Sequence, residues 1–298
     1  MKIFLENVNL SSTSGPNSFA KKIIPNLLSD GCSFVSPSEA DVALCFIETN
    51  NYSISLPRIQ RLDGIYFNTE QDYNQLNSNI KRTYKNSKGV VYQSKFSKNL
   101  IIKYFGEFEN SRVISNGADI ATINASKPMD TGPYDNIWSC AASWRPHKRL
   151  NENIRYFLEH KGPNDLLVVA GEVPEEKKVS ENSVVYFGNL SQNQLYSLYK
   201  SSKYFLHLAW LDHCPNVVVD ARACGSHVIC SSAGGTQEIA GPTATVIEEE
   251  EWDFEPTRLY HPPEMDFTKK KKNQFDSCYD ISEVARLYKQ FMEETICL

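Results

Sequence analysis

The sequence lacks a long apolar segment. No apolar run approaches the roughly 18 residues that a membrane-spanning helix requires. Near the amino terminus, the apolar run 3–5 ends at Glu6 and is too short for the core of a signal peptide. The eight cysteines form no Cys-x-x-Cys pair, and several lie in apolar runs, where free cysteine behaves as a small hydrophobic residue. These absences predict a cytoplasmic protein in a reducing compartment, with no transmembrane segment.

Several motifs for catalysis and metal binding are also missing. The sequence contains neither a Walker A loop nor the Gly-x-Ser-x-Gly turn of serine hydrolases. It contains no Asp-x-Asp and no set of His, Cys and Asp with the spacing of metal ligands. The net charge of -5 gives no overall positive field that would attract nucleic acid or anionic membranes. We therefore expect no metal cofactor.

Short apolar runs alternate with segments of helical period along the whole chain. The 298 residues, 41% hydrophobic and 22% charged, are sufficient for one large or two medium globular domains. The alternation favours an α/β architecture with doubly wound, parallel sheets. The stretch 117–135, rich in Gly, Pro and Asp, is the best candidate for a linker between two such domains.

The apolar runs predict the strands. We expect strands at 2–7, 41–46, 59–67, 89–94 and 112–117, and then at 136–143, 165–171, 183–189, 204–210, 227–232 and 243–248. The run 269–272 consists of lysines flanked by acidic residues, which is typical of a solvated loop. A final amphipathic helix is predicted over 281–294.

The stretch 210–241 holds the densest set of candidate binding residues. Pro215 suits the first turn of a helix, so Asp212 lies in the loop that enters it. Asn216 and Asp220 are four residues apart and share one face of this helix. A carboxylate one turn into a helix can accept two hydrogen bonds from a ribose diol. The same carboxylate could instead be a charge that is favourable to the helix dipole.

Gly234 and Gly235 follow the next buried strand. Their backbone amides, with that of Thr236, could approach phosphate groups at the start of another helix. Taken alone, the glycine pair is more typical of a sharp turn than of a ligand site. Two histidines lie nearby: His207, inside an apolar strand, is expected to be a core residue, whereas His213 in the acidic loop could contact a sugar.

The order of these parts resembles the donor-binding block of retaining nucleotide-sugar glycosyltransferases with the GT-B fold, family four. In that family a Glu, seven residues and a second Glu precede A-x-A-C-G-x-P-V-I and G-G-x-x-E. Here the two acids are Asp212 and Asp220, and His227 stands where proline is common. Upstream, Arg145 and Lys148 in "AASWRPHKRL" match the family's arginine and lysine, which neutralise the donor diphosphate.

The resemblance extends more loosely to the first half of the chain. "VISNGADI" (113–120) matches the element at the entry to the family's second domain. The loop with Gly15 stands where the family's first glycine-rich loop faces donor and acceptor. Asp63 lies near the end of a predicted strand, where many relatives carry a histidine beside the reacting sugar. From the residues alone, Asp63 is either paired with Arg61 or functional, because an unpartnered buried charge is costly.

The resemblance implies a GT-B fold of two Rossmann-like domains. Residues 1–130 would form an acceptor-side domain and residues 131–277 the donor domain, with 278–298 as a C-terminal helix returning to the first domain. The implied activity is retaining transfer of a hexose from a UDP- or GDP-sugar to an unidentified acceptor, which could be a glycan, a lipid-linked sugar, a protein or a nucleic acid. Two alternatives are a GT-B nucleotide-sugar epimerase and a non-catalytic nucleotide- or sugar-binding relative.

The resemblance also assigns the site residues. No metal is required, because Arg145 and Lys148 can supply the positive charge. The implied catalytic residues are Asp63, Asp212, Arg145 and Lys148. The implied donor-binding residues are Gly15, Arg145, Lys148, Asp212, His213, Asn216, Asp220, Gly234, Gly235 and Thr236.

Overall fold

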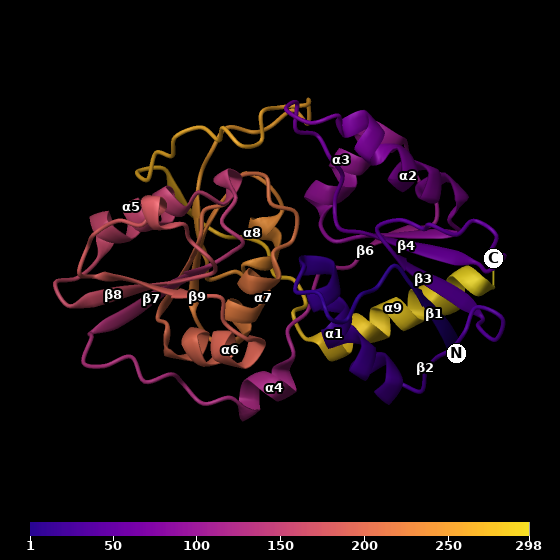
Figure 1. Cartoon of the computed structure of the whole chain (residues 1–298), viewed down its shortest axis with the longest axis horizontal. Coiled ribbons are helices and arrows are strands. Elements are labelled where there is room, and N and C mark those ends of the chain that lie inside the picture. Colours follow the sequence, from indigo (N-terminus) through magenta and orange to yellow (C-terminus); the bar gives the residue numbers. More distant parts are fainter. Residues whose placement is uncertain (298) are drawn as a thin grey trace. The chain divides into compact units, whose positions relative to one another are not determined.

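The computed structural model describes residues 1–297, which form two compact units (Figure 1). Unit 1 comprises Met1–Ala118, Asp253–Thr257 and the chain from Cys278 onwards. Unit 2 comprises Asp119–Trp252 and Arg258–Ser277. Each unit has helices packed on a largely parallel sheet, which confirms the predicted α/β class. Among the described residues, no helix is both long enough and apolar enough to cross a bilayer.

Unit 1 is built on a six-stranded parallel sheet. Its strands are β1 (Lys2–Glu6), β2 (Ser33–Phe34), β3 (Val42–Phe46), β4 (Arg58–Leu62), β5 (Gly89–Tyr92) and β6 (Ser111–Val113). They lie in the order β2-β1-β3-β4-β5-β6, and every neighbouring pair is parallel. Its first three helices are α1 (Gly15–Ser29), α2 (Tyr73–Asn86) and α3 (Lys95–Phe105). Strands β3 and β4 are buried along their whole length, as expected of a parallel sheet covered on both faces.

The last helix, α9 (Ile281–Ile296), completes the core of unit 1. It lies beside α1, as the yellow and indigo ribbons of Figure 1 show. The Phe19 and Tyr288 rings lie 5.8 Å apart, and Phe291 and Met292 are almost wholly buried in the same cluster. The amphipathic pattern of the final segment therefore reflects a face that packs against the first helix of the chain.

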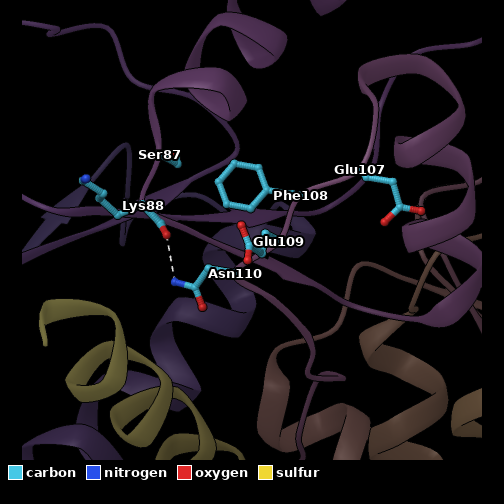
Figure 2. A pocket seen from close by; sticks show the side chains of 6 residues that line it. All are labelled: Ser87, Lys88, Glu107, Phe108, Glu109 and Asn110. Atoms are coloured by element: carbon cyan, nitrogen blue, oxygen red, sulfur yellow. Dashed lines mark hydrogen bonds between the residues drawn. The ribbon is translucent and has the colours of Figure 1, made fainter. Parts of the chain in front are cut away.

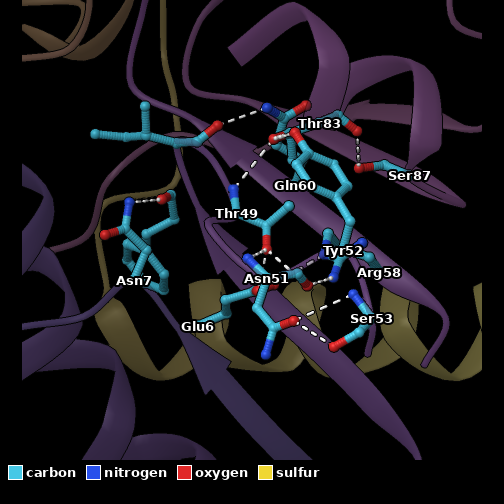
Figure 3. A network of polar contacts seen from close by, with 12 residues as sticks. Glu6, Asn7, Thr49, Asn51, Tyr52, Ser53, Arg58, Gln60, Thr83 and Ser87 are labelled. Carbon is cyan, nitrogen blue, oxygen red and sulfur yellow. Dashed lines mark hydrogen bonds and ion pairs between the residues drawn. The ribbon is translucent and has the colours of Figure 1, made fainter. Parts of the chain in front are cut away.

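The connection between β3 and β4 is a loop without a helix, and a polar network holds it in place (Figure 3). The Glu6 carboxylate accepts hydrogen bonds from Arg58 Nε, at 2.8 Å, and from the Thr49 hydroxyl. Asn79 Nδ2 on α2 donates to the Thr49 carbonyl at 2.9 Å. Both partners of the Glu6–Arg58 ion pair are buried, so loss of either would leave an uncompensated charge. The network ties the crossover loop to the sheet and to α2.

Unit 2 is built on a seven-stranded sheet. Its strands are β7 (Asn136–Ala141), β8 (Asp165–Ala170), β9 (Val184–Gly188), β10 (Tyr204–His207), β11 (His227–Ser231), β12 (Thr245–Ile247) and β13 (Lys270–Lys272). Their order is β13-β12-β11-β10-β7-β8-β9, and all are parallel except β13. The helices are α4 (Ile120–Ala125), α5 (Leu150–His160), α6 (Gln192–Ser201), α7 (Asn216–Ala223) and α8 (Thr236–Ile239), with short 3₁₀ turns η1 (Pro146–Lys148) and η2 (Glu175–Lys177).

Three local predictions were wrong. The lysine run expected to be a loop forms β13, an exposed edge strand paired with β12; lysine on an edge strand discourages pairing with further chains. The linker expected to be irregular contains α4, because the Asp119 carboxylate caps it by accepting from Thr122 N at 3.0 Å. The strand expected over 59–67 ends at Leu62, before Gly64 with its φ of 138°.

Candidate functional site

The loops after β7 and β10 meet at the carboxyl edge of the unit 2 sheet. Strands β8 and β9 extend the sheet on one side of β7, whereas β10, β11 and β12 extend it on the other. The strand order therefore reverses between β7 and β10. Open α/β sheets bind ligands outside the carboxyl ends of their strands at such a reversal. Most residues predicted to bind the donor lie on the loops that follow β7, β10 and β11.

Lys148 and Asp212 form an ion pair at this reversal. Lys148 Nζ lies 2.5 Å from Asp212 Oδ2, and His207 Nε2 lies 2.8 Å from the same oxygen. The other oxygen, Oδ1, accepts the backbone N–H of His213 at 3.0 Å. The side chains of Lys148 and Asp212 are 17% and 12% exposed. The structure thus brings together two residues that the sequence predicted separately.

Protonation within this cluster follows from its burial. Burial alone would raise the pKa of Asp212, but the Lys148 ammonium and the His207 hydrogen bond hold that pKa well below its usual value. Burial lowers the pKa of His207, and Asp212 offsets this only in part. Asp212 is therefore ionised and His207 neutral at pH 7. Because a carboxylate can only accept, Nε2 of His207 carries the proton.

The loop that carries Arg145 and Lys148 is held against the end of β8. Gly171 has a φ of 100°, and a Cβ there would lie 2.0 Å from the Ala142 carbonyl oxygen, so glycine is required. Trp144 Nε1 donates to the Ala170 carbonyl at 2.9 Å. Arg145 precedes η1 and is exposed. The close approach at Gly171 fixes the turn that leads from β7 to Lys148.

Arg149, next to Lys148, has a different role that the sequence did not reveal. Its guanidinium bonds both carboxylate oxygens of Glu249, at 2.8 and 2.6 Å, and the Pro263 carbonyl at 2.8 Å. Glu249 also accepts from the Ser231 hydroxyl at the end of β11. Arg149 and Glu249 are both almost fully buried. The only signal in the sequence was the position of Arg149 as a second cation beside Lys148. Glu249 gave no signal, because it lies in an acidic run that is typical of an exposed loop.

The two glycines after β11 bring this loop against Asp212. Gly234 has a φ of 109°, and a Cβ there would lie 2.6 Å from the Asp212 carbonyl oxygen and 2.8 Å from its nitrogen. The N–H of Gly235 donates to the Asp212 carbonyl at 2.7 Å, so this amide is already engaged within the chain. Thr236 is the first residue of α8 and is fully buried. The structure thus shows a close backbone approach of Gly234 to the Asp212 loop.

Asp220 and Asn216 lie on α7, as predicted. Asn216 is the first helical residue, and Asp220, one turn further, is 4% exposed. Asp220 Oδ2 accepts from Gln192 Nε2 at 3.1 Å, and Gln192 is the first residue of α6, after β9. Gln192 was not singled out in the sequence, because nothing in the local pattern around it suggested a carboxylate partner.

Asp63 and Gly15 lie in unit 1, whereas the other predicted site residues lie in unit 2. Gly15 is the first residue of α1. Asp63 follows β4 at the carboxyl edge of its sheet and is paired with Arg61, whose Nη1 lies 2.5 Å from both carboxylate oxygens. The pairing that the sequence left open is therefore present, and the Asp63 side chain is still 18% exposed.

A pocket at the other edge of the unit 1 sheet is separate from these residues (Figure 2). Its lining residues immediately precede β5 and β6, so it lies at the amino ends of those strands; they are Ser87, Lys88, Glu107, Phe108, Glu109 and Asn110. Among the described residues, no group of three or more His, Cys, Asp or Glu is arranged to hold a metal ion.

Comparison with known proteins bears on the same part of the chain. Residues 133–253 match the family model of glycosyl transferases group 1. The matched segment contains every candidate residue of unit 2, from Arg145 to Thr236. No curated protein matches the sequence.

Solved structures of glycosyltransferases resemble the whole chain. HepE of Anabaena, in complex with UDP and glucose, has a TM-score of 0.68 at 14% identity, over 98% of this chain and 99% of that one. AviGT4, a glycosyltransferase of avilamycin A biosynthesis, has a TM-score of 0.64 at 14% identity, over 99% of this chain and 98% of that one. Sucrose-phosphate synthase of Thermosynechococcus elongatus has a TM-score of 0.63 at 11% identity, over 99% of this chain and 90% of that one. These similarities confirm the predicted GT-B fold.

The buried His147 provides a test of this site by pH. Burial, reinforced by the nearby Lys148 charge, lowers the pKa of His147 to about 3. The folded protein therefore keeps this ring neutral, whereas the unfolded chain protonates it below about pH 6.5, the pKa of unfolded histidine. The free energy of unfolding therefore falls as pH is lowered past that value. Between pH 7.5 and 5, the free energy of unfolding of His147→Gln, measured with urea, should fall by about 2 kcal/mol less than that of the wild type.

Gly234→Ala tests the contact between the β11 loop and Asp212. Gly225 is the matched control, because its φ of 94° is similar and a Cβ there would meet nothing within 4 Å. Both substitutions force alanine into a left-handed conformation, which costs about 1–2 kcal/mol. The free energy of unfolding of Gly234→Ala, measured with urea, should fall by a further 1–3 kcal/mol or so, because the new Cβ overlaps the Asp212 backbone. Equal losses in the two variants would mean that the loop moves aside and the contact is not a constraint.

Proposed function

We propose that the protein is a retaining, metal-independent glycosyltransferase of family-four type, which transfers a hexose from a nucleoside-diphosphate sugar to an acceptor hydroxyl. The observation that carries this proposal is the Lys148–Asp212–His207 cluster at the strand-order reversal of unit 2. The cluster lies within the segment that matches glycosyl transferases group 1. A UDP-sugar is the favoured donor, because HepE, of the same fold, has been solved in complex with UDP-glucose; a GDP-sugar is the alternative.

Lys148 and Arg145 would bind the donor diphosphate. An ammonium has three N–H donors, and Asp212 accepts one from Lys148, so others remain for phosphate oxygens. Arg145 is exposed on the same loop and would add a second cation. Negative charge develops on the diphosphate as it departs, and charge-assisted hydrogen bonds to it strengthen at that moment. These two side chains would therefore supply the positive charge that a metal ion supplies in other enzymes.

The remaining residues of unit 2 would place the rest of the donor. Asp220, one turn into α7, would accept hydrogen bonds from the ribose hydroxyls, with Asn216 at the start of the same helix. Asp212 would face the donor sugar through the carboxylate that already orients Lys148, with His213 beside it. Gly234 and Thr236 would lie under the diphosphate.

The proposed reaction occurs on one face of the sugar. The bond between the anomeric carbon and the phosphate oxygen breaks, and the acceptor oxygen forms its bond on the face that the phosphate leaves. The acceptor proton passes to the departing phosphate oxygen, so the configuration at the anomeric carbon is retained. Asp63 of unit 1 would lie by the acceptor hydroxyl as its orienter; in the alternative, Asp63 is the base and takes this proton in place of the phosphate.

Product analysis tests the reaction class. The protein should consume one member of a panel of UDP- and GDP-hexoses, and NMR of the sugar first released, into water or onto an added acceptor, should show the anomeric configuration of the donor. An inverted anomer would contradict retention. Conversion of the donor to an epimeric nucleotide sugar without acceptor would instead identify an epimerase. Binding of a nucleotide without any turnover would identify a non-catalytic relative.

Lys148→Ala tests the diphosphate site. Loss of one charge-assisted hydrogen bond of roughly 1.5–3 kcal/mol should weaken UDP binding by about 10- to 100-fold in calorimetry. The matched control is Lys203→Ala, because Lys203 immediately precedes β10 and so lies at the opposite edge of the same sheet. It should bind UDP as wild type does. Unchanged UDP affinity in Lys148→Ala would refute the assignment of Lys148 to the diphosphate.

A further inference from the structure

Four polar side chains converge at the carboxyl edge of the unit 1 sheet. Asp63, Gln93 and Asn116 follow β4, β5 and β6, and Arg61 lies within β4. Strands β4, β5 and β6 are consecutive neighbours and parallel, so their carboxyl ends share one edge. Three separate parts of the chain therefore contribute to one cluster.

The cluster is closed by hydrogen bonds. Besides its two bonds to Asp63, Arg61 donates from Nη2 to Asn116 Oδ1 at 2.8 Å. Gln93 Nε2 donates to Asp63 Oδ1, and Asn116 Nδ2 lies 3.4 Å from Gln93 Oε1. Arg61 is wholly buried, and Gln93 and Asn116 are nearly so. Asp63 is the member of the cluster that reaches the surface.

The Arg61 guanidinium is held on its other side by aromatic rings. Its Cζ lies 4.1 Å from the centre of the Phe19 ring and 5.1 Å from that of Phe46, which is the geometry of a cation–π contact. A buried ion pair stabilises a fold little compared with apolar side chains of the same volume. The arrangement is therefore better explained by what it does to Asp63, whose carboxylate it holds in one orientation.

Among the described residues, one hydrogen-bonding position of Asp63 has no donor. Oδ1 accepts from both Arg61 and Gln93, whereas Oδ2 accepts from Arg61. Each carboxylate oxygen has about two lone-pair positions, so Oδ2 can take a second donor. Arg61 Nη1 and Nη2 and Gln93 Nε2 all donate inside the cluster. The surface of the cluster therefore presents an acceptor, which suits a hydroxyl and repels an anionic group.

We propose that Arg61, Gln93 and Asn116 are positioning residues that hold Asp63 as the hydrogen-bond acceptor for the attacking O–H group. This inference rests on the proposed glycosyl transfer and assigns the group bound at Asp63 to a neutral hydroxyl compound, either a sugar or water. Asp63 Oδ2 orients the O–H of the nucleophile, and the proton leaves with the departing phosphate. The three positioning residues do not touch the substrate.

Gln93→Ala tests the positioning role with a matched control. Truncating Arg61 would leave Asp63 unpaired and unfold the unit, so the neutral residue is the better choice. Gln60→Ala is the control, because Gln60 is also a buried glutamine, on β4, and its Nε2 bonds the Ile47 and Ile80 carbonyls and not Asp63. Both variants lose the hydrogen bonds of a buried amide, and urea unfolding measures the loss of stability in each.

The readout is hydrolysis of the preferred nucleotide sugar, with water as the nucleophile. Gln93→Ala should lower kcat by about 10- to 100-fold with little change in KM, because a misplaced orienting group affects the chemical step. Gln60→Ala should change neither. Equal kcat values in the two variants, or a raised KM with unchanged kcat in Gln93→Ala, would overturn the positioning role alone. Absence of turnover by the unaltered protein, both in water and with added acceptors, would overturn the proposed function, and this inference with it.

Discussion

The ion pair between Lys148 and Asp212 is the interaction on which the unit 2 site depends. The side chain of Asp212 holds Lys148, from the loop after β7, and its backbone accepts the N–H of Gly235, from the loop after β11. The same backbone leaves no room for a Cβ at Gly234. One residue thus joins the loops that follow three neighbouring strands. A ligand that draws Lys148 outwards would act on all three loops through Asp212, because the contacts are shared.

The two units use the same kind of ion pair to present opposite charges. In unit 1 the cation, Arg61, is fully buried and the Asp63 carboxylate is 18% exposed. In unit 2 the side chain of Lys148 is slightly more exposed than that of Asp212, at 17% against 12%, and Arg145 adds a second, exposed cation. A presented carboxylate suits a hydroxyl, whereas a presented ammonium suits a diphosphate. This difference matches the acceptor and donor roles proposed for the two units.

Sequence patterns predicted most elements that depend on local order, with α4 as an exception, and missed those that depend on distant partners. The alternation of apolar runs predicted both sheets. The motif order placed Asp212 correctly in a loop, Asp220 on a helix, and the glycines between a strand and a helix. The ion pair of Asp212 with Lys148 joins residues far apart in the chain, so no local pattern could reveal it. The same reason explains the error at β13, which is a strand only because β12 pairs with it.

Adjacent cations illustrate this limit most clearly. Arg149 has a left-handed backbone, with φ of 52° and ψ of 54°, which is unfavourable for any residue other than glycine. Its bonds to Glu249 and to the Pro263 carbonyl, from distant parts of the unit, compensate for this conformation. Because of this turn the two side chains point to different partners: Lys148 contacts Asp212, whereas Arg149 bonds Glu249 in the interior of unit 2. Which cation belongs to the site is therefore decided by Glu249, a hundred residues further along the chain.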